Sequence, residues 1–240
     1  MPELRLACGI VERRDRLKDR LAGLALVGSA LALAAADVIS PVMSSSDSEQ
    51  LAIVARHPDR QYVSALLALA ALALLGPAAL GLAHKLRGRW ASHGLTGVGL
   101  VFVGVVATAT ATALALVEWR AAGHGLDRAQ MTALLHELDT STGVAAVFLA
   151  GVGVPLGLGV LALGLYRDRV LPAPLALLVV LGPAVVDAGF TVNDLTTAIV
   201  GSAIMLVGYA LVARALFGFP GGGAAPVGRP EPAVAPYRGT

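Results

Sequence analysis

Six long apolar stretches recur along the 240-residue chain, and each is long enough to cross a membrane as a helix. A bilayer core about 30 Å thick needs roughly 20 apolar residues in helical form. Backbone amides in hydrocarbon must bond within their own segment, so each stretch is predicted to be a helix. The predicted spans cover residues 21–41, 62–83, 94–117, 142–165, 171–190 and 195–217. The chain is therefore expected to be an all-α, polytopic transmembrane helical bundle over 21–217, with a basic juxtamembrane segment before it and a tail after it.

The composition excludes several other classes of protein. Hydrophobic residues make up 56% of the chain and charged residues only 14%, with a mean hydropathy of +0.75. A soluble domain carries about 25% charged residues, so this chain lacks the polar surface that a soluble fold needs. A net charge of +2 leaves no extended basic face for nucleic acid, and a single cysteine, Cys8, excludes a disulfide scaffold. The expected surroundings are the lipid bilayer.

The basic residues predict the orientation. Of the 18 Lys and Arg residues, 14 lie in segment 1–20, in the second and fourth connectors, or at the carboxyl-terminal end; the other four are Arg56, Arg60, Arg120 and Arg128. Cytoplasmic loops carry the excess of Lys and Arg, so both termini are predicted to be cytoplasmic in a multi-pass plasma-membrane protein. An even number of spans agrees with this. One alternative remains: a basic start, an apolar run and Ala34-Ala35-Ala36 also resemble a signal peptide, and cleavage there would leave five spans.

Several connecting segments carry their own patterns. Segment 10–20 is predicted to be a juxtamembrane helix that continues into the first span, and 51–56 to be a short helix that ends before Pro58. Met131, Leu134, Leu135 and Leu138 form one apolar stripe behind a capping residue, Asp127. This pattern predicts an amphipathic helix at the outer interface, or a lid packed on the bundle. The tail, 218–240, is rich in Pro and Gly and is expected to be disordered.

Small residues and prolines suggest how the spans pack. Gly153 and Gly157 form a GxxxG motif in the fourth span, and Gly97 and Gly104 share a face of the third. Small residues let membrane helices approach closely, and packing within the chain is favoured over a homo-oligomer. The sequence Leu-Gly-Pro-Ala occurs around both Pro77 and Pro183, which would fit a 3+3 inverted repeat with interrupted helices.

Two acidic residues lie within predicted spans, where ionisable groups are candidates for function. Asp37 and Asp187 each follow the cytoplasmic start of their span by 16 residues, which puts both about 24 Å up the helix at 1.5 Å per residue. If the first and fifth spans were neighbours, the two carboxylates could share a proton. The alternative is that both reach the outer headgroups.

Further candidates lie at the outer face. Glu118, Asn193, Asp194 and His136 join Asp37 and Asp187 as residues of possible function. Asn193 and Asp194 fit helix capping better than ligand coordination. His57, His124 and His136, with nearby acids, lack the spacing of a metal motif, so no metal site, catalytic residue or cofactor is predicted.

The basic start Arg13-Arg14-Asp15-Arg16, the long first outer loop, the Gly-Pro spans and the Pro-rich tail resemble small six-span membrane proteins common in GC-rich bacteria. That resemblance covers the whole topology and implies a fold class and a membrane location, with no activity attached. A bacterial origin also fits the usage of Arg, since all but two of the 18 basic residues are Arg. The first functional hypothesis is a non-enzymatic accessory or structural protein, with a protein partner or a second copy in the membrane. The alternatives are a small-solute or proton-coupled transporter, and a membrane enzyme that uses the outer acids and histidines.

Overall fold

A computed structural model describes residues 2–41, 46–86, 90–123 and 127–217, and every regular element among them is a helix. Six segments are long and apolar enough to cross a membrane, as predicted: Leu17–Ile39, Pro58–His84, Ala91–Ala121, Thr142–Arg167, Ala173–Thr191 and Leu195–Phe217. The helices are α1 (Pro2–Ile39), α2 (Asp47–Arg56), α3 (Pro58–His84), α4 (Ala91–Ala121), α5 (Arg128–Asp139), α6 (Thr142–Gly151), α7 (Gly153–Arg167), α8 (Ala173–Thr191) and α9 (Leu195–Phe217). The tail at 218–240, predicted to be disordered, lies outside the described residues.

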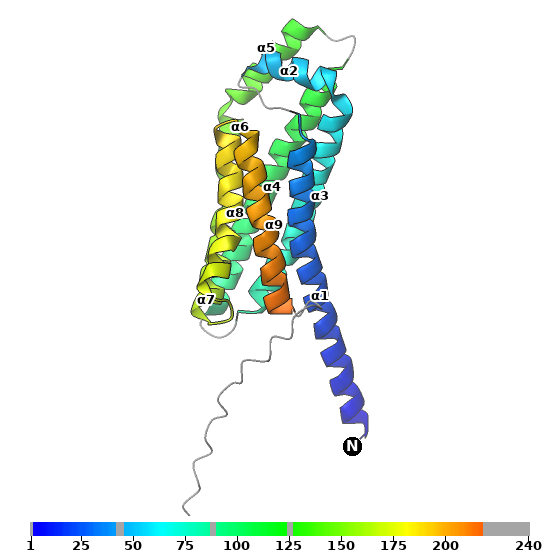
Figure 1. The fold of residues 1–240 in the computed structure, drawn as a ribbon, viewed down its shortest axis with the longest axis vertical. Helices are drawn as coiled ribbons and strands as arrows, with labels where there is room; N and C mark the ends of the chain where they lie inside the picture. The colour runs from blue at the N-terminus through cyan, green and yellow to red at the C-terminus, as the bar shows by residue number, and fades with distance from the viewer. Residues whose placement is uncertain (1, 42–45, 87–89, 124–126, 218–240) are drawn as a thin grey trace, which may run out of the picture.

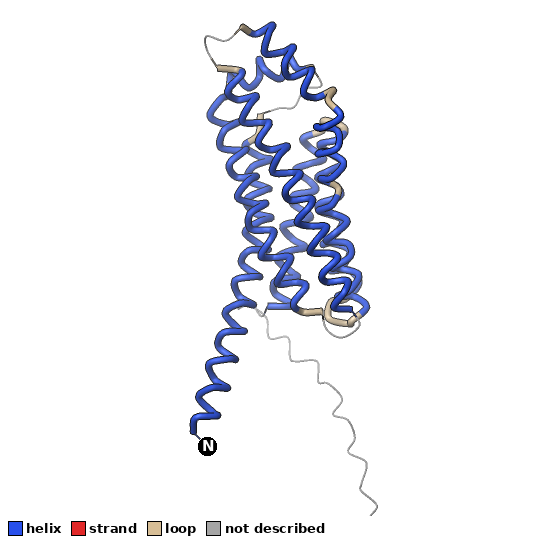
Figure 2. Tube along the Cα trace, turned by 180° about the vertical axis from the view of Figure 1, so that it is seen from behind, coloured by secondary structure: helices blue, strands red, loops and turns tan. Residues whose placement is uncertain are grey.

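The spans pack in the order in which they occur in the chain. Helix α1 packs on α3, α3 on α4, α4 on α6 and α7, α7 on α8, and α8 on α9. Helix α9 then returns to α1, so the last span closes a ring on the first (Figure 1). Figure 2 shows the same elongated helical bundle from behind.

One apolar cluster fills the interior of this ring, and every span contributes to it. Its fully buried side chains include Leu26 of α1, Leu82 of α3, Val101 of α4, Leu161 of α7, Val179 of α8 and Tyr209 of α9. Large apolar side chains also cover the outside, among them Leu31, Val106, Leu177 and Val207. A soluble monomer rarely exposes so much apolar surface, whereas a membrane protein presents it to lipid.

The predicted glycine motifs pack inside the chain. A Cβ atom added to Gly157 of α7 would lie 2.6 Å from the backbone nitrogen of Val101 on α4. A Cβ on Gly104 of α4 would overlap the backbone of Gly153 and Val154. Only glycine permits this approach of two backbones, so these residues form an intrachain α4–α7 contact, as the sequence favoured.

A second glycine contact joins α8 to α9, and the sequence analysis did not identify it. A Cβ on Gly182 would lie 2.6 Å from the Cα of Met205, and one on Gly201 would lie 2.5 Å from the backbone nitrogen of Val186. Gly182 faces Met205, and Val186, four residues further along α8, faces Gly201, four residues earlier on α9. The two pairs therefore belong to one antiparallel register. Glycines seven residues apart on each helix, including Gly189 on α8, keep this contact close along its length.

Pro77 and Pro183 do not interrupt their helices, as the inverted repeat would require. Helices α3 and α8 run without interruption through Pro77 and Pro183, and Pro77 is exposed whereas Pro183 is buried. The two Leu-Gly-Pro-Ala segments therefore have different surroundings and do not support an inverted repeat with interrupted helices. The fourth span is divided instead, at Val152, between α6 and α7. Pro155 explains this division. Proline has no backbone N–H to donate to the carbonyl of Gly151, four positions earlier, and its ring clashes with that carbonyl.

The connecting helices follow the sequence closely. Helix α1 runs from Pro2 through the first span, which confirms the continuous juxtamembrane helix. Helix α2 starts four residues earlier than predicted, at Asp47, and Pro58 both ends it and begins α3. Helices α2 and α5 lie together beyond one end of the bundle (Figure 1). Their buried contact is a small cluster of Leu51, Ala121 and Leu135, so α5 is a lid packed on α2 and the end of α4.

Candidate functional site

Asp37 is the most deeply buried of the six candidate residues. It lies near the carboxyl-terminal end of α1 and is only 3% exposed. Its carboxylate accepts a hydrogen bond of 2.5 Å from the hydroxyl of Ser202, which is fully buried on α9. Buried polar groups need such partners, and this bond joins the two helices that close the ring.

Two more side chains bind the same end of α1 from the opposite side. The hydroxyl of Ser64 on α3 donates to the carbonyl oxygen of Ala36 at 2.9 Å. The Nε of Arg60 donates to the carbonyl oxygen of Ile39 at 3.1 Å. The carbonyl oxygen of Ala36 already accepts from the backbone N–H of Ser40, so Ser64 adds a second hydrogen bond to it. Ile39 is the last residue of α1, where a carbonyl has no partner within the helix, and Arg60 supplies a donor to it. The carboxyl-terminal end of α1 is thus hydrogen-bonded to both neighbouring helices, α3 and α9.

Asp37 and Asp187 do not meet, because the first and fifth spans are not neighbours, so the condition under which the two carboxylates could share a proton is not met. Helix α9 packs between α1 and α8, and Asp187 is exposed on α8 while Asp37 is buried. The expectation of similar depth holds better. Asp37 pairs with Ser202 of α9. The α8–α9 register puts Asp187 beside Val200, which lies only two residues before Ser202 on α9. Similar depth brings two side chains together only if their helices are neighbours.

Asn193 and Asp194 form the turn between α8 and α9, as the capping interpretation predicted. Asn193 has a φ of 53°, in the left-handed region that Asn tolerates better than most residues. The carboxylate of Asp194 accepts from the backbone N–H of Thr196 at 3.0 Å and from the hydroxyl of Thr197. The Thr197 hydroxyl holds the pKa of Asp194 below its ordinary value, because it stabilises the charged form.

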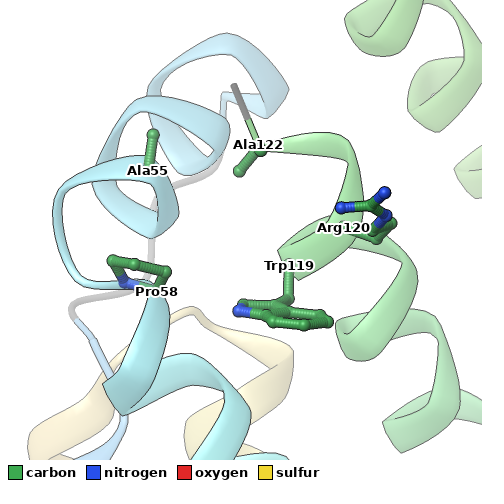
Figure 3. Close-up of a pocket in the computed structure, with 6 residues that line it drawn as sticks. Ala55, Pro58, Trp119, Arg120 and Ala122 are labelled. Carbon is green, nitrogen blue, oxygen red and sulfur yellow. The ribbon is translucent and has the colours of Figure 1, made fainter. Parts of the chain in front are cut away.

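Glu118 and Trp119 lie in the last turns of α4, and Trp119 lines a small pocket between this end of α4 and the junction of α2 with α3. The Trp119 ring packs against Tyr62 of α3 with the ring centroids 5.0 Å apart. The pocket measures about 130 Å³, and Figure 3 shows the Trp119 ring extending toward Pro58 across it. Its lining residues are Ala55, Pro58, Trp119, Arg120, Ala122 and Gly123. This space accommodates a small apolar group and offers no pair of groups for acid–base chemistry.

His136 lies on the exposed side of α5, away from the apolar stripe. Met131, Leu135 and Leu138 of that stripe pack inward, while Leu134 remains exposed. Asp127 caps α5 by accepting from the N–H of Ala129 at 2.9 Å, which confirms the predicted cap. In the described part of the chain, no three His, Cys, Asp or Glu side chains gather in a way that could hold a metal ion.

Two buried hydroxyl groups were missed from the sequence. Ser202 follows Gly201 in the last span, and a serine within an apolar span is the signal that could have suggested a partner for Asp37. Tyr209 is fully buried in the central cluster, and its hydroxyl is the buried side-chain polar atom for which the described residues supply no partner. A tyrosine well inside a span, away from the interfacial aromatic belt, was the corresponding signal.

No protein-family model, curated protein or solved structure matches this chain. The chain is a helical protein with six segments able to span a membrane.

Proposed function

We propose that this protein resides in the plasma membrane with both termini in the cytoplasm and acts there as a non-enzymatic accessory or structural protein. The charge distribution supports the orientation through the positive-inside rule. At the end of the bundle opposite the lid, Lys85 forms an ion pair of 2.7 Å with Asp19 and lies 5.2 Å from the Phe217 ring centre. Arg167 lies over the ring of Trp90 at the same end. Basic side chains with aromatic neighbours are typical of a membrane–water interface.

The functional proposal rests on one observation: three acidic side chains form hydrogen bonds that stabilise the fold. Asp37 joins α1 to α9, Asp194 caps α9 and Asp127 caps α5. Each of these acids makes a hydrogen bond that fixes a helix end or a helix pair. A bundle whose acids hold the fold together supports a structural role better than a catalytic one.

The orientation can be tested with the single native cysteine. Cys8 should react with a membrane-permeant maleimide, and an impermeant one should label it only after the cells are opened. In a Cys8→Ser background, Ser48→Cys in α2 should react with the impermeant reagent in intact cells, and Ser92→Cys in α4 should not. Both serines are exposed. Labelling of Ser92→Cys but not Ser48→Cys in intact cells would reverse the proposed orientation.

A proton-coupled transporter is the second candidate, and the burial of Asp37 favours it. A carboxyl group within a membrane span is costly and is a common proton carrier in transporters. In proteoliposomes with an imposed pH gradient, a transporter should move protons or a co-substrate, and Asp37→Asn should abolish that movement. Asp127→Asn, at an exposed cap in the lid, is the matched control and should leave transport unchanged. If the wild-type protein transports nothing across a broad panel of solutes, the accessory role stands.

A further inference from the structure

Asp187 presents a carboxylate on the outer surface of a membrane-spanning helix. Helix α8 has 19 residues and is therefore about 28 Å long, close to the thickness of the hydrocarbon core. Asp187 precedes the last residue of α8 by four positions, which sets it about 6 Å inside that end. An aspartate side chain is too short to extend over this distance to the headgroups as Lys or Arg can.

The surface around Asp187 is largely apolar, although the polar Thr191 and Asn193 are also exposed toward the end of α8. Leu181 is exposed before it on α8, and Phe190 and Val192 are exposed beyond it, toward the outer end. On the neighbouring helix α9 the residue at the same level is Val200, and it is exposed. Exposed apolar side chains therefore occur beyond Asp187 as well as before it, interspersed with polar ones at the end of α8.

The described residues supply no hydrogen bond or ion pair to this carboxylate. The hydroxyl of Thr191, one turn further along α8, donates to the backbone carbonyl of Asp187 at 2.8 Å and not to its carboxylate. A carboxyl group that faces lipid without a partner is unfavourable, and such groups in membrane proteins are usually paired. The surface therefore carries a polar group that the described residues leave available to a partner outside the bundle.

The side chains next to Asp187 are small. Ala184 and Ala188 are exposed on the same face of α8, four residues apart, and Thr191 follows one turn later. We propose that this α8 face, made of Ala184, Asp187, Ala188 and Thr191, docks a transmembrane helix of another protein that presents an Arg or Lys in the outer part of the membrane. The two alanines let the helix backbones approach closely, and the base pairs with the carboxylate. This inference rests on the proposed accessory role and names the chemistry of the partner.

A second copy of this chain fits the face less well than a basic helix. Two copies share one orientation in the membrane, so a symmetric contact through α8 would place Asp187 against Asp187 of the other copy. Like charges disfavour that pairing, and one carboxyl group would have to be protonated. Arg214, the base within the last span, lies at the opposite membrane face and cannot reach Asp187 of a second copy.

The test uses a synthetic single-span helix of Leu and Ala with one Arg placed about 6 Å from its outer end. A matched peptide carries Leu at that position. Both are reconstituted in vesicles with the full-length protein, and association is measured by energy transfer between labels. Binding of the Arg peptide should exceed that of the Leu peptide by about 3- to 30-fold, the range that interhelical polar contacts in membranes give.

Variants of the protein locate the site. Asp187→Leu should remove the preference for the Arg peptide, and Val103→Ala on the lipid-facing side of α4 should preserve it. Equal binding of the two peptides to the wild-type protein, or a preference that survives in Asp187→Leu, would overturn the proposal. Cross-linking of two copies through Asp187→Cys in the absence of peptide would also overturn it, in favour of self-association. The peptide assay does not depend on transport, so a positive transport result would refute the accessory role while leaving this measurement to decide the α8 face by itself.

Discussion

The hydroxyl of Ser202 donates a hydrogen bond of 2.5 Å to the carboxylate of Asp37, and the two residues are 165 positions apart in the chain. This bond joins the first membrane helix to the last and closes the ring of spans. Both side chains are buried, so their contact lies between helices and not at the lipid surface.

Ser202→Ala should destabilise the bundle by about 1 kcal/mol, because Asp37 loses its donor and interhelical hydrogen bonds in membranes contribute on this scale. The measurement is reversible unfolding in mixed micelles. Thr110→Ala is the control, since its exposed hydroxyl bonds only to the carbonyl of Val106 on its own helix. Purely additive effects of Ser202→Ala and Asp37→Leu in a double-mutant cycle would show that the two residues are not coupled.

Gly104→Ala should cost about 1–3 kcal/mol, the range observed when a methyl group is forced into a packed contact. Gly99 lies on the same helix, and a Cβ there would meet nothing within 4 Å. Gly99→Ala should therefore leave stability unchanged or raise it slightly. Thermal unfolding in detergent compares the two variants, and equal melting temperatures would contradict the close α4–α7 contact.

Leu135→Ala should loosen the lid. Leu135 is 9% exposed and packs with Leu51 and Ala121, whereas its neighbour Leu134 is 44% exposed. A buried Leu-to-Ala change costs about 2 kcal/mol or more. Hydrogen exchange of α5 should therefore accelerate in Leu135→Ala and remain as in the wild type in Leu134→Ala. An equal response of the two variants would mean that the lid is not held by this cluster.

The start of α9 should weaken in acid. The lowered pKa of Asp194 means that the folded chain favours the charged carboxylate, so the cap contributes fully above the ordinary aspartate pKa of about 3.9. That contribution is lost as the pH falls through the lowered value. Asp194→Asn retains a capping acceptor that does not titrate. Hydrogen-exchange rates at residues 195–199 are compared between the wild type and Asp194→Asn from pH 6 to pH 3. The rates of the two proteins should diverge only at the acidic end of this range.

The spans and caps were predictable because they depend on local sequence. A run of apolar residues determines a membrane-length helix wherever it occurs, and the predicted and observed spans agree to within a few residues at most ends. The cap at Asp127 and the turn at Asn193 and Asp194 also depend on residues within four positions. The division of the fourth span at Val152 follows from Pro155 three residues later, although the sequence alone did not distinguish it from Pro77 and Pro183.

The sequence by itself determined the number of membrane-length segments, their approximate limits and the similar levels of Asp37 and Asp187 along their helices. Only the tertiary structure decided that α9 lies between them, that Ser202 is the partner of Asp37 and that Asp187 faces outward. The physical reason is that all six spans are similarly apolar, so hydropathy does not encode which helices are neighbours. That choice depends on the fit of small residues such as Gly182 and Gly201 against a facing backbone, and this fit exists only once the helices are packed.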